Sequence, residues 1–268
     1  MNLEFSRVVE HREAGAAYRL LVLESPAIAP LVRPGQFVHV RVPALDGSVL
    51  RRPFSVFKTD GPRLSILYKL VGRGTRAMQA LRPGDEIHVM GPLGHGFPVA
   101  DASGFPILVA GGYGVAALYL AAKQLPAKGI LFVGGVRAAE ILCIEDFEAL
   151  GWPVRIATED GSRGRQGLVT AVLDQWLADE RGAQRPEFWA CGPMGMLRAV
   201  SERAVSGGWL AWLSLDRHMG CGVGACLACV QKIRKPESVS DGAPTAWARV
   251  CKEGPVFESR QIVWDEGE

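Results

Sequence analysis

Four cysteines near the end of the 268-residue chain have a spacing that is typical of metal binding: Cys221, Cys226, Cys229 and Cys251. Four, two and 21 residues separate successive members, which is the plant-type spacing of thiolates that bind a [2Fe–2S] cluster. Three ligands would come from one tight loop and the fourth from a distant segment. The spacing therefore predicts a cluster with these four residues as its metal ligands.

Glycines 220, 222 and 224 alternate with the other residues of this loop. They allow the backbone to wrap closely and to turn N–H groups toward sulfur, which stabilises the reduced, more negative cluster. The alternative is a structural zinc site, but zinc sites usually contain two C-x2-C pairs or a mixture of Cys and His, and only one C-x2-C is present here. We interpret His218 as a neighbour of the site and Cys143 as a buried residue of an apolar helix.

Two short motifs in the first third of the chain suit a flavin dinucleotide. In RRPFS (51–55), Arg52 can pair with a pyrophosphate as a fork, and the hydroxyl of Ser55 can donate to a ring nitrogen of a flavin. In GRGT (72–75), Gly72, Gly74 and Thr75 suit phosphate binding at a helix N-terminus. A simple strand-to-helix turn is the alternative for the second motif.

Three motifs in the middle of the chain suit a nicotinamide dinucleotide, and each follows an apolar strand. AGGYGVAAL (110–118) places Gly111, Gly112 and Gly114 where the backbone can approach a pyrophosphate, or where a strand and a helix simply pack tightly. CGPMGML (191–197) places Cys191, Gly192 and Pro193 where a nicotinamide ring would meet the flavin.

The third of these motifs, TEDGSRG (158–164), leaves the choice of dinucleotide open. Glu159 or Asp160 would bind ribose hydroxyls and favour NADH. Arg163 and Arg165 would instead bind a 2′-phosphate, although a solvated charged loop is the preferred interpretation of these two arginines.

Elements of two kinds position these motifs. Before residue 101, short strands alternate with Gly-Pro turns, which favours a β-barrel, and one short helix is expected over 75–84. From 102 to 210, continuous apolar strands alternate with helices, which predicts a parallel-sheet α/β domain. The expected strands are 36–43, 52–59, 63–71 and 85–92 in the barrel, and 105–112, 129–136, 153–160 and 186–193 in the α/β domain, with helices over 115–125, 139–150, 169–180 and from 194. Residues 211–268 form a small cysteine-bearing domain with little periodicity.

Composition limits the function. With 48% hydrophobic and 22% charged residues the chain can form a large core, and a net charge of +2 without a basic stripe argues against nucleic-acid binding. The N-terminal residues lack the pattern of a signal peptide, and no apolar run is long enough to span a membrane. We therefore expect a cytoplasmic protein that does not bind membranes.

Together these motifs resemble the ferredoxin–NADP reductase superfamily, and more closely the electron-transfer subunits of two-subunit, NAD-dependent bacterial dihydroorotate dehydrogenases. Besides the motifs above, LYKLVGRGT, GPLGHGF and CKEGPVF carry the similarity, which covers nearly the whole chain. The resemblance implies that Arg52, Pro53, Phe54 and Ser55 hold FAD, that Lys69, Leu70 and Val71 line it, and that Gly74 and Thr75 meet its phosphates.

The resemblance also implies an activity and a partner. The chain would be an oxidoreductase subunit that passes electrons between NAD(H), FAD and a [2Fe–2S] cluster, with Ser55 and Cys191 next to the reacting rings. Its partner would be an FMN-containing dihydroorotate dehydrogenase subunit of pyrimidine biosynthesis, in a heterotetramer with two copies of each chain. Two alternatives remain: the same module serving a hydrogenase, a bifurcating transhydrogenase or another oxidoreductase complex, and a non-catalytic scaffold that holds zinc.

Overall fold

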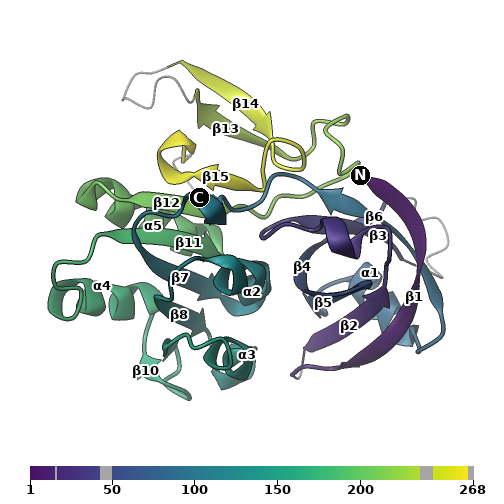
Figure 1. Ribbon diagram of the computed structural model, residues 1–268, viewed down its shortest axis with the longest axis horizontal. Coiled ribbons are helices and arrows are strands. Elements are labelled where there is room, and N and C mark those ends of the chain that lie inside the picture. The colour runs from purple at the N-terminus through teal and green to yellow at the C-terminus, as the bar shows by residue number, and fades with distance from the viewer. Residues whose placement is uncertain (16, 43–49, 236–243, 265–268) are drawn as a thin grey trace.

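The computed structural model describes residues 1–15, 17–42, 50–235 and 244–264, and the first part of the chain forms a barrel. Six antiparallel strands of the described chain close it in the order β1-β2-β5-β4-β3-β6. The right-hand part of Figure 1 shows this barrel. Its strands are β1 (Asn2–Glu13), β2 (Tyr18–Glu24), β3 (Phe37–Arg41), β4 (Arg52–Asp60), β5 (Arg63–Lys69) and β6 (Glu86–Leu93).

Strand β3 shows how sequence alternation divides the inside of the barrel from the outside. Val38 and Val40 belong to the apolar cluster that fills the barrel. Phe37 points the other way and packs in the cluster beneath the C-terminal segment. Because side chains alternate between the two faces of a strand, His39 lies on the same outer face as Phe37. The expected barrel is confirmed, although β1 and β2 were not expected from the sequence.

The single helix of the barrel is shorter than expected. Helix α1 spans Arg73–Ala77 and continues only as a 3-10 turn over Met78–Ala80. The expectation of a helix over 75–84 was therefore wrong at both ends. Thr75 explains the early start, because its Oγ1 accepts hydrogen bonds from the backbone N–H groups of Val71 and Gly72 at 2.9 and 3.2 Å.

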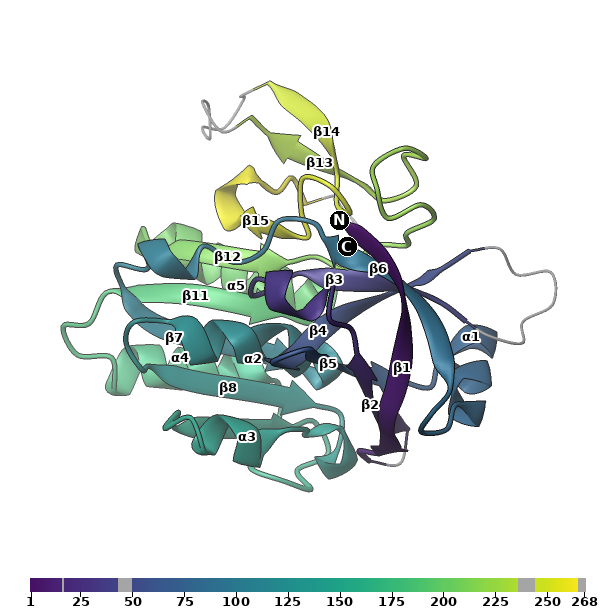
Figure 2. The same cartoon turned by 45° about the vertical axis from the view of Figure 1, so that its right-hand side comes forward.

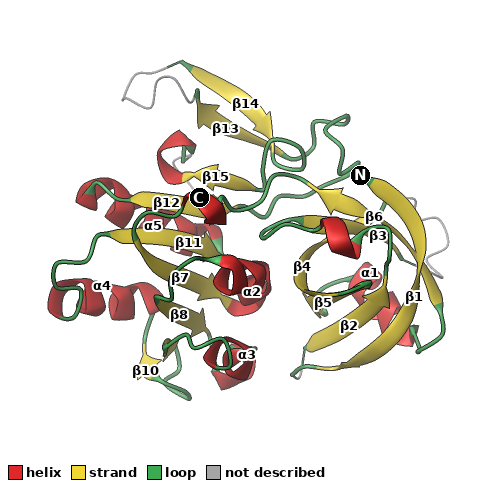
Figure 3. Cartoon of the chain, in the orientation of Figure 1, coloured by secondary structure: helices red, strands yellow, loops and turns green. Residues whose placement is uncertain are grey.

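The α/β domain contains a sheet of seven described strands in the order β10-β9-β8-β7-β11-β12-β15. All neighbouring strands are parallel except β12 and β15. Figure 3 shows helices on both faces of this sheet. The strands are β7 (Phe105–Gly111), β8 (Ile130–Gly135), β9 (Val154–Thr158), β10 (Arg165–Gln166), β11 (Pro186–Cys191), β12 (Leu210–Ser214) and β15 (Val256–Glu258), and the helices are α2 (Val115–Gln124), α3 (Ile144–Glu148), α4 (Val169–Asp179) and α5 (Met194–Gly207).

The uninterrupted apolar strands follow from burial of both faces of the sheet. On β7, Ile107 and Val109 pack in the cluster that includes residues of α4 and α5. Leu108 and Ala110 pack in the cluster that includes residues of α2 and α3. Helix α2 also touches the barrel, since the rings of Tyr119 and Phe57 meet edge to face with centroids 5.1 Å apart. The expected parallel sheet is confirmed.

The helix expected over 139–150 is present only in part, as α3 over Ile144–Glu148. A 3-10 turn (Ala138–Glu140) precedes α3, and Cys143 stands between them with a left-handed backbone (φ 59°). Cys143 is thus a helix-capping residue and not part of an apolar helix. Burial raises the pKa of its thiol to about 12, so it remains protonated at neutral pH.

The C-terminal segment contains more regular structure than its sequence suggested. Strands β13 (Val230–Arg234) and β14 (Thr245–Arg249) pair in an antiparallel ribbon. In both Figure 1 and Figure 2 this ribbon lies above the junction of the barrel and the α/β sheet. Hydrophobic side chains from all three parts share one core beneath it, among them Phe37, Ile107 and Val250.

The expected division of the chain at residues 101 and 210 stays a prediction. The α/β sheet takes up β12 and β15, both of which begin at or after residue 210. In the described part of the chain no helix combines the length and the hydropathy needed to cross a bilayer.

Candidate functional site

The two flavin motifs meet at one end of the barrel. Arg52 begins β4, and the side-chain Nε of Arg52 would lie only 2.9 Å from a Cβ built on Gly74. Glycine at position 74 therefore lets the guanidinium pass directly over the start of α1. The Nη1 of Arg52 donates to the backbone carbonyl of Leu50 at 2.7 Å, which orients the side chain. Residues that the sequence placed in separate motifs thus lie side by side.

The remaining flavin candidates lie along β4 and β5. Pro53 and Ser55 pair with His39 and Phe37 of β3. Because directly paired residues share a face, they lie on the outer face of the barrel. The ring of Phe54 packs against Tyr68, with centroids 5.6 Å apart, so it contributes to the barrel core.

Lys69, Leu70 and Val71 follow one another at the end of β5. Lys69 forms an ion pair of 3.1 Å with Glu140 of the α/β domain and lies over the ring of Tyr18. The backbone N–H of Leu70 donates to Ala17 at 2.8 Å, while the side chain of Val71 is exposed. Tyr18 and Glu140 were missed by the sequence interpretation, which had no local motif to mark them.

The glycine motif after β7 and the CGP segment after β11 are in direct contact. Cys191 pairs with Ala110 at the ends of the two adjacent parallel strands. A Cβ on Gly114 would lie 2.2 Å from the carbonyl oxygen of Cys191, and a Cβ on Gly111 would lie 2.5 Å from Pro193 Cδ. Glycine is required at both positions. The carboxyl edge of the sheet thus presents bare backbone where dinucleotides bind in open α/β sheets.

The side chains of Tyr113, Asp216 and Cys191 set the electrostatic character of this glycine turn. The hydroxyl of Tyr113 donates to Asp216 Oδ2 at 3.4 Å, which links the turn to the segment that leads into the cysteine loop. Burial raises the pKa of Asp216. Burial also raises the pKa of Cys191 to about 12, so Cys191 is a neutral thiol.

The acidic pair after β9 is oriented by its own loop. Asp160 accepts hydrogen bonds from the backbone N–H and the hydroxyl of Ser162, at 2.9 and 2.5 Å. These two bonds lower the pKa of Asp160. Arg165 donates to Gln175 of α4. Among the described residues, the carboxylate of Glu159 makes no hydrogen bond and is the free carboxylate at this edge of the sheet. Arg165 is directed toward α4.

The four cysteines come together as two pairs. The backbone N–H of Cys226 donates to Cys221 Sγ, and the backbone N–H of Cys251 donates to Cys229 Sγ, both at 3.4 Å. Among the residues with described positions, no group of three or more His, Cys, Asp and Glu side chains surrounds one metal ion. Two pairs fit a two-iron cluster, in which four thiolates are divided between two irons.

Backbone N–H groups point at the sulfurs of both pairs. The N–H groups of Val223, Ala225 and Cys226 donate to Cys221 Sγ at 3.5, 3.2 and 3.4 Å. The N–H of Gly224 donates to Cys251 Sγ at 3.2 Å. This donor set suits thiolates that carry negative charge.

The thiol pKa values agree with these contacts. Burial opposes ionisation of Cys221, but the backbone N–H groups of Val223, Cys226 and Ala225 lower its pKa to about 6. Burial and the adjacent Cys229 thiol raise the pKa of Cys251 to about 12. A bound metal cation would favour the thiolate form of Cys251 and offset this rise in its pKa. The four cysteines therefore fit an iron–sulfur group.

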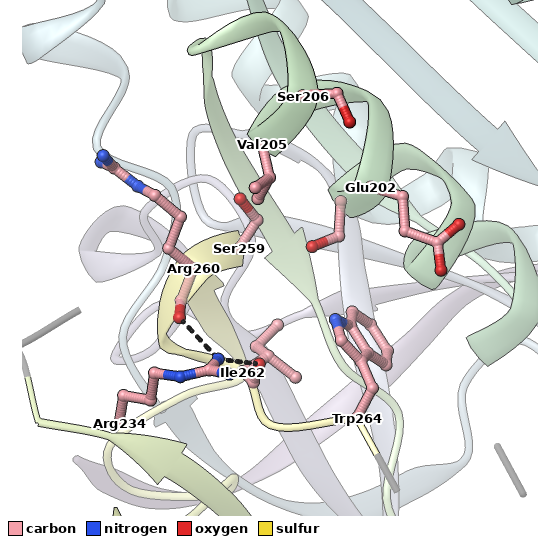
Figure 4. A pocket seen from close by; sticks show the side chains of 9 residues that line it. Glu202, Val205, Ser206, Arg234, Ser259, Arg260, Ile262 and Trp264 are labelled. Atoms are coloured by element: carbon pink, nitrogen blue, oxygen red, sulfur yellow. Dashed lines mark hydrogen bonds between the residues drawn. The ribbon is translucent and has the colours of Figure 1, made fainter. Parts of the chain in front are cut away.

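The pocket shown in Figure 4 lies away from the predicted site residues. A cavity of about 300 Å³ lies between α5 and the C-terminal segment (Figure 4). Its lining includes Glu202, Arg234 and Trp264, and none of its residues is a predicted site residue. Arg234 donates to the backbone carbonyls of Arg260 and Ile262, both at 3.2 Å, and so holds the C-terminal segment in place.

Known proteins agree with this geometry. The family model described as the iron-sulfur cluster binding domain of dihydroorotate dehydrogenase B matches residues 216–263. The chain is 40% identical over 263 residues to the electron transfer subunit of dihydroorotate dehydrogenase B (NAD(+)) from Geobacillus thermodenitrificans, with 96% of each chain covered. The Bacillus cereus (strain Q1) protein of the same name is 36% identical, again over 96% of each chain.

Solved structures show the same architecture. The NADH-dependent reduced ferredoxin–NADP oxidoreductase, studied for flavin-based electron bifurcation, matches with a TM-score of 0.82 and 26% identity over 98% of this chain and 91% of that chain. The cytochrome b5 reductase domain of Ulva prolifera nitrate reductase shares the fold, with a TM-score of 0.63 and 18% identity, over 77% of this chain and 94% of that chain.

The barrel, the doubly wound sheet and the paired cysteines define a reductase of the ferredoxin–NADP reductase type with an added iron–sulfur domain. Within that class, the near-complete match to curated relatives is decisive. The chain belongs to the family of electron transfer subunits of dihydroorotate dehydrogenase B.

Proposed function

We propose that this chain carries electrons between NAD(H) and the catalytic subunit of a dihydroorotate dehydrogenase, through FAD and a [2Fe–2S] cluster. The observation that carries the proposal is the pairing of Cys221 with Cys226 and of Cys229 with Cys251, where the cysteine loop meets the segment after β14 beside the flavin barrel. A loop of this kind gives a hydride-accepting site an exit for single electrons. Family membership over 96% of the chain supports the same function.

Each group has a proposed set of residues. The division into a flavin barrel (1–101), a nucleotide domain (102–210) and a cluster domain (211–268) is part of the proposal. Cys221, Cys226, Cys229 and Cys251 would bind the cluster. FAD would be held by Arg52, Pro53, Phe54, Ser55, Lys69, Leu70, Val71, Gly72, Gly74 and Thr75. NAD(H) would be held by Gly111, Gly112, Gly114, Glu159, Asp160, Cys191, Gly192 and Pro193.

The bound groups would supply hydride exchange and single-electron transfer, while the protein supplies binding and orientation. Arg52 lies across Gly74, where its guanidinium would pair with a pyrophosphate. Ser55 would offer its hydroxyl to a flavin ring nitrogen. Cys191 is a neutral thiol at the end of β11, so it would line the nicotinamide site without adding charge. The reaction needs no acid–base pair at this site.

The partner would be an FMN-containing subunit that interconverts dihydroorotate and orotate in the cytoplasm, in a hetero-oligomer with two copies of each chain. The relatives' names support this partner. A reductase module serving another complex is the second candidate, and the similarity to the ferredoxin–NADP oxidoreductase of electron bifurcation favours it. The chain is 40% identical to the dihydroorotate dehydrogenase subunit and 26% identical to the ferredoxin–NADP oxidoreductase, and this difference favours the dihydroorotate partner.

Co-expression with the catalytic subunit tests the proposal. The complex is expected to reduce NAD⁺ with dihydroorotate, and the catalytic subunit alone is expected to lack this NAD⁺-linked activity. A complex carrying Cys226→Ser is the matched control, and it should keep electron transfer from NADH to a dye. If the two chains do not associate and dihydroorotate does not reduce NAD⁺, the proposed partner is wrong.

A further inference from the structure

His39 of β3 is a buried histidine whose ring nitrogens have no hydrogen-bond partner among the described residues. Its exposed fraction is 0%. Both ring nitrogens are enclosed and make no hydrogen bond with the part of the chain that the structure describes. Leaving a buried polar group unpaired is costly, because the group loses its hydrogen bonds to water without gaining others. A histidine in this setting suits a hydrogen-bond partner other than the described residues, such as a bound group.

The ring of His39 lies directly against the cysteine loop. A Cβ built on Gly222 would lie 2.7 Å from both the Cε1 and the Nδ1 of His39. Gly222 follows Cys221 and has a positive φ of 72°. Glycine at this position therefore allows the imidazole edge to touch the loop backbone next to a proposed cluster ligand.

The same ring also borders the flavin strand. His39 pairs with Pro53 of the RRPFS motif, and its ring centroid lies 5.7 Å from that of Phe37. His39 thus connects the strand proposed to hold FAD with the loop proposed to hold the cluster. The backbone donors described above reach Cys221 Sγ from within the loop alone. A donor from the barrel side would complete the set around the sulfurs.

We propose that His39 donates a ring N–H hydrogen bond to a sulfur of the iron–sulfur cluster and thereby couples the barrel to the cluster loop. The inference rests on the cluster of the proposed function. A neutral imidazole has one N–H donor, and sulfur that gains negative charge on reduction is stabilised by such a donor. Its loss should therefore make the cluster harder to reduce.

Replacing the donor tests this role in the co-expressed complex. In His39→Leu, the equilibrium constant for one-electron reduction of the cluster should fall about tenfold, which corresponds to about 59 mV. In His39→Asn, whose amide N–H takes the place of Nδ1–H, most of the shift should disappear. The potential is read by EPR during a redox titration. An unchanged potential in His39→Leu, or no recovery in His39→Asn, would overturn the inference.

Pulsed EPR with ¹⁵N-histidine gives a second measurement that does not depend on activity. The reduced cluster should show a nitrogen coupling in the labelled wild-type protein. The matched control is His218→Asn, because His218 is the histidine three residues before Cys221. The coupling should persist in this control and vanish in His39→Asn.

The outcomes separate this inference from the proposed function. If the wild-type protein has no cluster signal at all, the proposed function fails. If the cluster is present but uncoupled to histidine, only the role of His39 fails. A change of the flavin potential in His39→Leu, with no change at the cluster, would also overturn the inference, because the unpaired nitrogens would then serve the flavin. If the His39 variants do not fold, the labelled wild type still decides the question together with His218→Asn and His95→Asn, because His95 bonds the Lys252 carbonyl next to Cys251.

Discussion

The glycine turn after β7 and the cysteine loop both depend on glycine, but for different physical reasons. At Gly111 and Gly114 a side chain would collide with the neighbouring CGP segment, at distances of 2.5 and 2.2 Å. At Gly222 and Gly224 the backbone has positive φ values of 72° and 81°. Gly111 and Gly114 are needed for close approach alone, whereas Gly222 and Gly224 are needed for a left-handed backbone as well as for close approach.

This difference follows from what each region binds. Close packing in the first region leaves bare backbone at the sheet edge, which suits the approach of a flat dinucleotide. Left-handed turns in the second region direct N–H groups at Cys221 and Cys251, which suits sulfur.

Loss of one proposed cluster ligand should abolish electron exit. In Cys226→Ser, transfer to the catalytic subunit is expected to be lost almost completely, while NADH still reduces an artificial dye at the flavin. Cys226 is exposed, so its replacement should leave the barrel intact. The two activities are measured on the same preparation. Equal loss of both would contradict the separate roles of the two regions.

A side chain in the glycine turn should impair nucleotide use. Gly114→Ala introduces a methyl group that would lie 2.2 Å from the Cys191 carbonyl oxygen. A displacement of about 1 Å can cost on the order of 10²-fold in rate, so NADH-dependent flavin reduction should fall by that order. The cluster spectrum should not change. Gly195→Ala is the matched control, because nothing lies within 4 Å of a Cβ at Gly195.

A side chain at Gly222 should combine backbone strain with a collision. The left-handed backbone alone costs an L-residue roughly 1–2 kcal/mol, and a Cβ would also meet His39 at 2.7 Å. Gly61→Ala is the matched control for strain alone, because Gly61 has φ 52° and no atom within 4 Å of its Cβ. Chemical unfolding measures the loss of stability in both variants. Equal losses of stability in the two variants would show that the contact with His39 has no energetic weight.

The ion pair of Lys69 and Glu140, which joins the barrel to the α/β domain, should have the smallest effect. Burial alone would raise the pKa of Glu140, but the Val136 backbone N–H and Lys69 lower it overall. The pair therefore stabilises the fold above the carboxyl pKa of the unfolded chain, and this contribution disappears as the pH falls through the lower, folded value. Glu140→Gln should cost about 0.5–1 kcal/mol at neutral pH, and the cost should vanish in acid. An undiminished cost in acid would contradict the assignment.

Features of the fold and the site could be predicted from the sequence where the pattern that marks them lies in neighbouring residues. The parallel strands and α2 were predicted because their apolar residues are contiguous, and the cysteine spacing indicated the cluster directly. Strands β1 and β2 were missed; in β1, charged residues such as Glu10 and Arg12 obscure the buried face.

Long-range contacts could not be predicted from local signals. His39 appears in the sequence as an ordinary residue of a barrel strand, and only the fold brings Gly222 against it. The same applies to the packing of Arg52 over Gly74 and to the ion pair of Lys69 with Glu140.

The most direct test of the electron-transfer function is the visible spectrum of the anaerobically purified protein, recorded with its iron and zinc content before and after NADH is added. We expect flavin bands with a broad iron–sulfur shoulder, two irons per chain as a [2Fe–2S] cluster requires, and bleaching of both chromophores by NADH. A colourless protein that contains zinc would contradict the account. So would a protein with both chromophores that NADH does not bleach.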